Sequence, residues 1–397
     1  MFGTATSATQ IEGGCRSSDW HAFARQPGRI KHGDTPDVAC DSWSRWREDV
    51  ALQKSLGMQG YRLGLEWARI EPRPGEIDRA ALGEYRAMLG ALKDAGIAPM
   101  VTLHHFTLPL WLADEGGVLA AGFAQRLAHF ARIAVEALGD LCRLWITINE
   151  PNVLAAHGYL LGVWPPARKN PVLALLAQRR LLAAHDAAYR ALKDARGDDV
   201  HVGVAHHLRA IEPGHPGSRA DRAAATVFRR VFNDAFAAGA CAHGTQDFFG
   251  INYYSRDVVS FSARHAGELF VERRVPRDAE VSDLGWEIYP EGLGHVVRAW
   301  ARRSGLPVYI TENGIADARD DRRGPFIVRH LAELERLLAE GVDVRGYYHW
   351  SLLDNFEWAE GYEPRFGLCA VDYATGERRL RDSAHLYARI ARERTVV

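Results

Sequence analysis

The chain has 397 residues, of which 47% are hydrophobic and 25% charged, and its 49 basic and 50 acidic residues leave a formal net charge of −1. This balance is ordinary for a globular protein. It disfavours a nucleic-acid partner, because a phosphate-binding surface needs a clear excess of basic residues. No apolar run reaches the ~18 residues that a membrane-spanning helix requires, so no membrane partner is expected.

Five cysteines are scattered through the chain without a Cys-x-x-Cys pair: Cys15, Cys40, Cys142, Cys241 and Cys369. An odd and scattered set is typical of reduced thiols in a cytoplasmic protein. The first residues, MFGTATSATQ, contain neither the basic nor the apolar segment of a signal peptide. We therefore expect a cytoplasmic protein.

Short apolar runs alternate with longer amphipathic segments along the chain. The runs predict buried strands over Phe2–Ala8, Gly60–Trp67, Ala98–Phe106, Leu144–Glu150, His201–Leu208, Asp247–Tyr254, Pro307–Glu312 and Val344–Leu353. The segments between them predict helices over Trp46–Leu56, Asp78–Leu92, Phe123–Leu138, Val172–Leu192, Ala220–Ala238, Glu291–Arg303, Phe326–Glu340 and Ser383–Arg394.

This alternation predicts a closed (β/α)8 barrel of the TIM type. Right-handed crossovers make successive strands parallel, and eight such units close on themselves. A doubly wound open sheet is the alternative, weakened because no Gly-x-Gly-x-x-Gly loop follows the first strand. Since no long linker or repeat interrupts the pattern, we expect one catalytic barrel domain over residues 1–397.

Polar side chains gather where the predicted strands end, which is where barrel enzymes carry their chemistry. The candidates are Gln10, Arg62, His104, His105, Asn149, Glu150, Asn252, Tyr254, Glu312, Asn313 and Trp350. Two carboxylates among aromatic rings and amides are the minimal machinery for glycoside cleavage. Taken alone, Glu150 or Glu312 could equally be a catalytic residue or an ordinary loop or turn residue. Arg62, inside an apolar strand, requires a buried anionic partner.

Two pairs of adjacent histidines, His104–His105 and His206–His207, raise the hypothesis of a metal-dependent hydrolase. Neighbours on a strand point to opposite faces, so only one histidine of each pair can face the site. No His-x-His spacing of the metallohydrolase kind occurs at these ends. We expect neither a metal nor a cofactor. A chelator would abolish the activity of a metal-dependent hydrolase and would leave that of a glycosidase unchanged.

Eight segments resemble the family 1 glycoside hydrolases, which include β-glucosidases and β-galactosidases, and they occur in that family's order. They are ATSATQIEGG, EDVALQKSLGMQGYRLGLEWARIEP, TLHHFTLPLWL, WITINEP, DFFGINYY, DLGWEIYPEGL, YITENG and WSLLDNFEWAEGYEPRFGL. The resemblance implies a retaining mechanism with Glu150 as acid/base and Glu312 as nucleophile, oriented by Arg62 and Tyr254. It also implies that the sugar is held by Gln10, His105, Asn149, Asn252, Trp350, Glu357 and Trp358.

The same resemblance indicates the substrate. A Glu357 carboxylate would repel a 6-phosphate, and Glu150 stands where the thioglucosidase branch has Gln. We therefore expect an exo-acting β-glycosidase, most consistently a β-glucosidase, that takes terminal neutral sugars of small β-glycosides or oligosaccharides. A β-galactosidase or β-fucosidase, or a transglycosylase, are alternatives on the same site. A non-catalytic glycan-binding barrel is disfavoured, because both carboxylates remain.

Two further expectations concern the site itself. Arg62 and Tyr254 should keep Glu312 ionised, and its charge should then raise the pKa of Glu150. Phe228–Asp247 is some tens of residues shorter than the family pattern before the sixth strand. Since that segment borders the outer side of the site, we hypothesise a more open cavity that binds substrate weakly.

Overall fold

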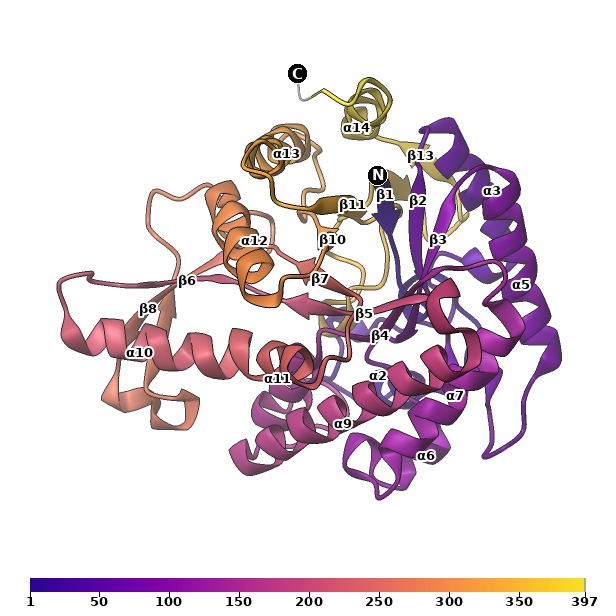
Figure 1. Ribbon diagram of the computed structural model, residues 1–397, viewed down its shortest axis with the longest axis horizontal. Coiled ribbons are helices and arrows are strands. Elements are labelled where there is room, and N and C mark those ends of the chain that lie inside the picture. Colours follow the sequence, from indigo (N-terminus) through magenta and orange to yellow (C-terminus); the bar gives the residue numbers. More distant parts are fainter. Residues whose placement is uncertain (396–397) are drawn as a thin grey trace.

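The computed structural model describes residues 1–395, except the side chains of 266–268, and its centre is a closed barrel of parallel strands (Figure 1). The strands follow one another in the order β1-β11-β10-β7-β5-β4-β3-β2. They are β1 (Phe2–Ala5), β2 (Gly60–Gly64), β3 (Ala98–His104), β4 (Leu144–Asn149), β5 (His201–His207), β7 (Phe248–Asn252), β10 (Val308–Asn313) and β11 (Val344–Trp350). The predicted eightfold barrel is confirmed.

Helices surround the barrel (Figure 1). The longer ones are α3 (Ser42–Ser55), α5 (Arg79–Asp94), α7 (Phe123–Leu138), α9 (Pro171–Arg196), α10 (Arg219–Arg229), α11 (Ala235–His243), α12 (Pro290–Ser304), α13 (Arg323–Ala339) and α14 (Asp382–Glu393). The shorter ones are α1 (Ala8–Ile11), α2 (Asp19–Ala24), α4 (Trp67–Ile70), α6 (Leu110–Asp114) and α8 (Pro151–Leu154). Within the described residues, no helix is long and apolar enough to cross a membrane.

Local sequence explains where the helices begin. The side chain of Asp78 accepts hydrogen bonds from the backbone N–H groups of Ala80 and Ala81 and so caps α5. Asn170 caps α9 in the same way, and Pro171 follows at the first helical position, where its missing N–H has no cost.

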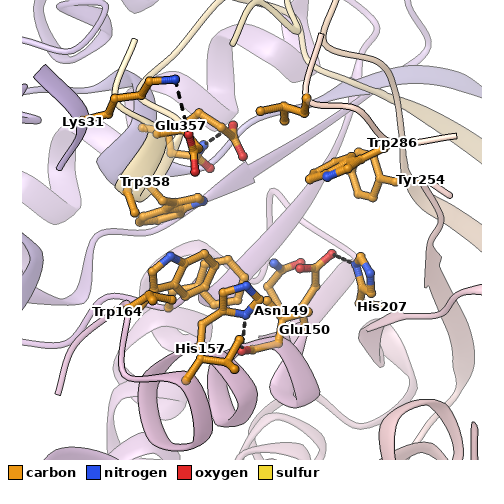
Figure 2. A pocket seen from close by; sticks show the side chains of 18 of the residues that line it. Lys31, Asn149, Glu150, His157, Trp164, His207, Tyr254, Trp286, Glu357 and Trp358 are labelled. Atoms are coloured by element: carbon orange, nitrogen blue, oxygen red, sulfur yellow. Dashed lines mark hydrogen bonds and ion pairs between the residues drawn. The ribbon is translucent and has the colours of Figure 1, made fainter. Parts of the chain in front are cut away.

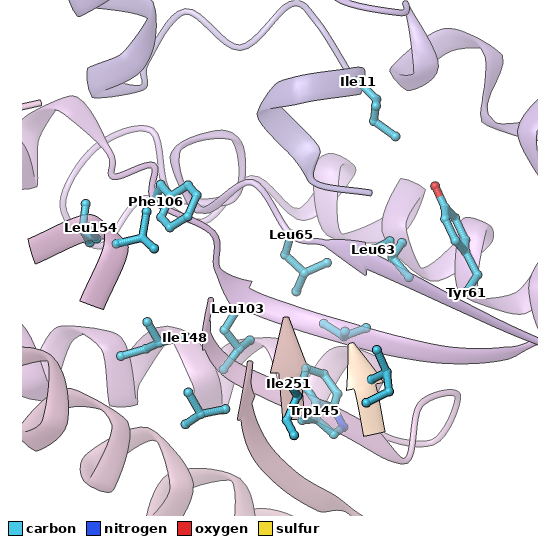
Figure 3. Close-up of a cluster of buried hydrophobic side chains, with 14 of the residues drawn as sticks. Ile11, Tyr61, Leu63, Leu65, Leu103, Phe106, Trp145, Ile148, Leu154 and Ile251 are labelled. Carbon is cyan, nitrogen blue, oxygen red and sulfur yellow. The ribbon is translucent and has the colours of Figure 1, made fainter. Parts of the chain in front are cut away.

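Alternate residues of the strands supply two apolar layers. Leu103 of β3 and Trp145 of β4 belong to the large cluster between the strands and the surrounding helices (Figure 3). Met100 and Ile146, on the same two strands, belong to a separate smaller cluster. This alternation is the pattern of a barrel whose interior is filled by side chains and whose outside is covered by helices.

The structure differs from the sequence expectation at several element ends. The first two predicted strands end three residues early, because Ala8 and Trp67 each begin a short helix instead. The helix predicted over Ala220–Ala238 is interrupted by a π-helical segment, η5 (Arg230–Asp234). Additional strands, which the apolar pattern did not predict, form β6-β8-β9 (Ala210–Pro213, Arg256–Phe261, Val271–Arg274) and β12-β13 (Cys369–Val371, Arg378–Leu380).

Candidate active site

A cavity of about 1000 Å³ opens where the barrel strands end, and most of the predicted site residues line it (Figure 2). These are Gln10, His105, Asn149, Glu150, Tyr254, Glu312, Trp350, Glu357 and Trp358. Arg62 and Asn252 lie directly behind this surface, and neither is exposed to solvent. The structure therefore brings together residues that the sequence spreads over nearly its whole length.

Both strands that carry a candidate carboxyl are irregular just before it. The register of β4 against β5 shifts between Ile146 and Asn149, and that of β10 against β7 shifts between Ile310 and Glu312. Glu150 adopts a left-handed backbone conformation with φ of 44°. Such irregularities re-aim side chains next to sites, and left-handed non-glycine residues concentrate there.

The Glu312 carboxyl accepts a hydrogen bond on each oxygen. The Arg62 guanidinium donates from Nη1 to Oε1 at 2.5 Å, and the Tyr254 hydroxyl donates to Oε2 at 2.5 Å. Arg62 also donates to Thr102 and to Asn149, so its planar group is held on several sides. The buried guanidinium thus has the anionic partner that its position in the sequence required.

The Glu150 carboxyl is held on one oxygen only. Its Oε1 accepts from Nδ1 of His207 and from Nδ2 of Asn252, both at 2.9 Å. In the part of the chain that the structure describes, no protein donor reaches Oε2 of Glu150. The Asn252 amide also donates to Oδ1 of Asn149, which accepts from Arg62. One hydrogen-bonded chain therefore joins Glu150 to Glu312.

Aromatic rings and polar groups form the rest of the wall. The ring of His105 lies nearly parallel to those of Trp350 and Trp358, with centroids 5.9 and 6.0 Å away. Its Nε2 accepts from the Asn149 amide at 3.1 Å. Across the cavity, the Gln10 amide donates to a carboxyl oxygen of Glu357 at 3.2 Å. These flat rings and paired polar groups suit a ligand with an apolar face and several hydroxyls.

The histidine pairs divide as expected from strand geometry. His105 and His207 line the cavity, whereas the ring of His104 lies against Phe123 and that of His206 against Phe249. Among the described residues, no group of three or more His, Cys, Asp or Glu side chains is arranged to hold a metal ion.

The carboxyl pKa values differ from the sequence expectation. Burial, aided by the nearby charge of Glu150, raises the pKa of Glu312 to about 7, although Arg62 and Tyr254 act against it. Burial also acts to raise the pKa of Glu150, whereas a positive charge on His207 and the hydrogen bonds from His207 and Asn252 act to lower it. Sequence reasoning counted the charge on Glu312 and not these groups beside Glu150.

A third carboxyl, that of Glu357, lines the same cavity as Glu150 and Glu312. Burial, together with the charges of Glu312 and Glu150, raises the pKa of Glu357 to about 8.

Several residues of the wall were not assigned from the sequence. They are His157, Trp164, His207, Arg209, Trp286 and Phe366. Trp286 lies inside one of the segments that resemble family 1, so the motif itself was the available signal. His207 was considered only as a metal ligand, and nothing in its immediate sequence pointed to Glu150.

A closed parallel barrel with buried carboxyls, amides and aromatic rings at its strand ends has the architecture of an enzyme that cleaves carbohydrates. The chain matches Glycosyl hydrolase family 1 over residues 1–245 and 238–396. It is 35% identical to beta-glucosidase A of Thermotoga maritima, over 99% of this chain and 96% of that protein. It is 33% identical to a beta-glucosidase of an Agrobacterium species, over 98% of this chain and 94% of that one.

Solved structures agree with these relatives. A beta-glycosidase from Pyrococcus horikoshii superposes with a TM-score of 0.94 at 36% identity, covering all of this chain and 95% of the other. The Thermotoga maritima beta-glucosidase in complex with glucoimidazole superposes with a TM-score of 0.93 at 32% identity, covering all of this chain and 98% of the other. The chain belongs to glycosyl hydrolase family 1, and it is a glycoside hydrolase of the β-glucosidase type.

The comparisons also bear on the shortened segment. The alignment with the Thermotoga beta-glucosidase A spans 437 positions against 397 residues in this chain, so that relative carries residues this chain lacks. The family match divides into two pieces that meet at residues 238–245, at the end of α11 and just before β7. The break thus falls within Phe228–Asp247, the segment that the sequence identified as short.

Proposed function

We propose that this protein is a retaining exo-β-glucosidase in which Glu312 is the nucleophile and Glu150 the acid/base. One observation carries the assignment of the two roles: both oxygens of Glu312 accept hydrogen bonds, whereas Oε2 of Glu150 accepts none among the described residues. The Arg62 and Tyr254 donors both stabilise the carboxylate form of Glu312. A proton on Oε2 of Glu150 displaces nothing and faces the cavity.

The reaction then runs in two steps. Oε1 or Oε2 of Glu312 attacks the anomeric carbon while Glu150 gives its proton to the glycosidic oxygen, so the C–O bond to the leaving group breaks and a glycosyl ester forms. The negative charge of Glu312 is consumed in that ester. Glu150, now a carboxylate, takes a proton from water, which attacks the same carbon and releases the sugar and Glu312.

The wall positions the sugar for this attack. We assign Trp350 as the surface under the ring, and Gln10, Glu357 and Trp358 as the groups that bind hydroxyls at its far end. His105 and Asn149 lie on the side of the carboxyls, and Asn149 is also bound to Arg62. Asn252 joins Asn149 to Glu150 and acts by orienting both.

The substrate class follows from the same wall and from the relatives. Neutral glycosides fit a cavity that buries three carboxyls, and a beta-glucosidase 32% identical to this chain binds glucoimidazole. Galactosides and fucosides differ from glucosides at ring positions that Gln10 and Glu357 would contact, so they are the second candidates. Transfer of the sugar to another sugar uses the same ester, with a hydroxyl replacing water.

Labelling with 2,4-dinitrophenyl 2-deoxy-2-fluoro-β-glucoside tests the proposal. The fluorine slows both steps, while the good leaving group lets the first proceed, so the ester accumulates. We expect intact mass to rise by one fluoroglucosyl group and peptide mapping to place it on Glu312, with no label on a Glu312→Ala variant. Hydrolysis of an ordinary aryl glucoside without any adduct, or an adduct elsewhere, would overturn the assignment. The fluorogalactoside measures the rival specificity.

A further inference from the structure

The carboxyl of Glu150 is joined to a second chain of polar groups that leads away from Glu312. Nδ1 of His207, the last residue of β5, lies 2.9 Å from Oε1 of Glu150. Nε of Arg209 donates to Nε2 of His207 at 3.1 Å. Nη1 of Arg209 donates to both oxygens of Asp257, at 3.1 and 3.2 Å. Four side chains thus form the series Asp257–Arg209–His207–Glu150.

This series determines the proton on the imidazole. A guanidinium N–H only donates, so Nε2 of His207 must accept and carries no hydrogen. The ring is then neutral, with its hydrogen on Nδ1, where it donates to Glu150. Asp257 in turn holds Arg209 against His207. Because Nδ1–H donates to Oε1, the proton of an acidic Glu150 resides on Oε2, on the side of the cavity.

Packing holds the imidazole in place. Its side chain is 6% exposed, and that of Asp257 is 9% exposed. The ring stacks on Tyr254 with centroids 6.0 Å apart, and the ring of Phe232 lies nearly perpendicular to it with centroids 5.9 Å apart. Tyr254 also donates a hydrogen bond to Glu312, so the ring that stacks on His207 is itself held in place within the site.

The support comes from elements outside the barrel. Asn233 of η5 accepts from the backbone N–H of Arg209 and donates to its carbonyl, at 3.2 and 2.8 Å. Phe232, next to it, packs under the Arg209 guanidinium and also contacts the ring of His207. Asp257 lies on β8, in the sheet that projects to the side of the barrel in Figure 1. The shortened segment Phe228–Asp247 therefore supports Arg209 and His207 through Phe232 and Asn233.

We propose that His207, held by Arg209 and Asp257, is a positioning residue that keeps Oε2 of Glu150 directed at the departing oxygen. The proposal rests on the function of Glu150 as acid/base proposed above. Because Nδ1–H donates to Oε1 whether Oε2 is protonated or not, the carboxyl keeps one orientation through both steps. Water and substrate then meet the same oxygen.

The charged or titratable groups around His207 come from several elements. They are Glu150 after β4, His157 of the π-helical segment η3 (Ala155–Leu161), Arg209 after β5, Tyr254 after β7 and Asp257 of β8. A test must therefore report on protonation of the leaving group and not on the total charge of the site.

The leaving group provides that test. The dinitrophenolate of a 2,4-dinitrophenyl β-glucoside departs without a proton, whereas the methoxyl group of a methyl β-glucoside must be protonated as it leaves. The ratio of kcat/KM for the dinitrophenyl substrate to that for the methyl substrate therefore reports on acid catalysis alone. We expect His207→Leu to raise this ratio at least tenfold, and His207→Asn, which retains a donor near Nδ1, to raise it less. His206→Asn is the matched control: it alters a buried histidine on the same strand that contacts Gln246 and not Glu150.

Equal losses on both substrates in His207→Leu would overturn the proposal. Arg209→Met, which keeps the stem and removes the donor, should raise the ratio in the same direction, and it decides the matter where His207→Leu fails to fold. Glu150→Ala separates the acid/base role of Glu150 from the positioning role of His207. If Glu150→Ala leaves the ratio unchanged, the proposed acid/base role fails. If it raises the ratio and the His207 and Arg209 variants do not, only the positioning role fails.

Discussion

Replacing Tyr254 with Phe removes one of the two donors that hold Glu312 ionised. The lost hydrogen bond is short, at 2.5 Å, and its acceptor is a buried carboxyl oxygen. A hydrogen bond to a charged group contributes about 1.5–3 kcal/mol. Since one pKa unit corresponds to about 1.4 kcal/mol, removing a donor that stabilises only the carboxylate should raise the pKa of Glu312 by about one to two units.

The direction of the effect on activity follows. The pKa of Glu312 lies at about 7 with Tyr254 present, and the nucleophile must be ionised. Activity therefore falls as the pH drops below this pKa, and a higher pKa moves the acidic limb of the profile to higher pH. We expect the acidic limb of kcat/KM for an aryl β-glucoside to move from near pH 7 to pH 8 or above in Tyr254→Phe.

The neighbouring tyrosine supplies the control. Tyr253 is fully buried and donates to the backbone carbonyl of Tyr289 at 2.7 Å, away from Glu312. Tyr253→Phe should therefore lower stability without moving the acidic limb. A limb that stays in place in Tyr254→Phe, that moves to lower pH, or that moves equally in both variants would refute this account of the Glu312 environment.

Three further predictions concern specificity, metals and stability. Glu357→Ala should lower kcat/KM for aryl β-glucosides by about ten- to a hundredfold, because it removes hydrogen bonds to two sugar hydroxyls worth about 1–3 kcal/mol together; an unchanged value contradicts the sugar-binding role. EDTA should leave the hydrolysis rate unchanged, and a loss restored by a divalent cation would revive the metal hypothesis. Arg378→Met leaves the buried Asp49 without its ion pair and should lower the free energy of unfolding, measured by urea denaturation, by about 3–5 kcal/mol. As the control, Arg379→Met at an exposed ion pair should change this free energy by less than about 0.5 kcal/mol. Equal losses in the two variants would refute the argument.

The strand positions were predictable because burial on both faces leaves a pattern in the sequence. The strand predicted over Leu144–Glu150 is found over Leu144–Asn149, and the helix predicted over Phe123–Leu138 has those bounds. Ends were predicted less well where a short helix follows the strand directly, as at Trp67, since its first turn is as apolar as the strand. The projecting sheet escaped prediction because β8 is only half-buried.

The sequence by itself determined the barrel, the cavity at the strand ends and the meeting of Arg62, Tyr254 and Glu312, because these follow from local apolar patterns and from eight recognisable segments. Only the tertiary structure decided what stands next to Glu150. His207 meets it from another strand, while Arg209 and Asp257 come together from a loop and a separate sheet. Hydrogen-bond partners and pKa values depend on distances of a few ångströms between such segments, and apolar periodicity carries no information about those distances.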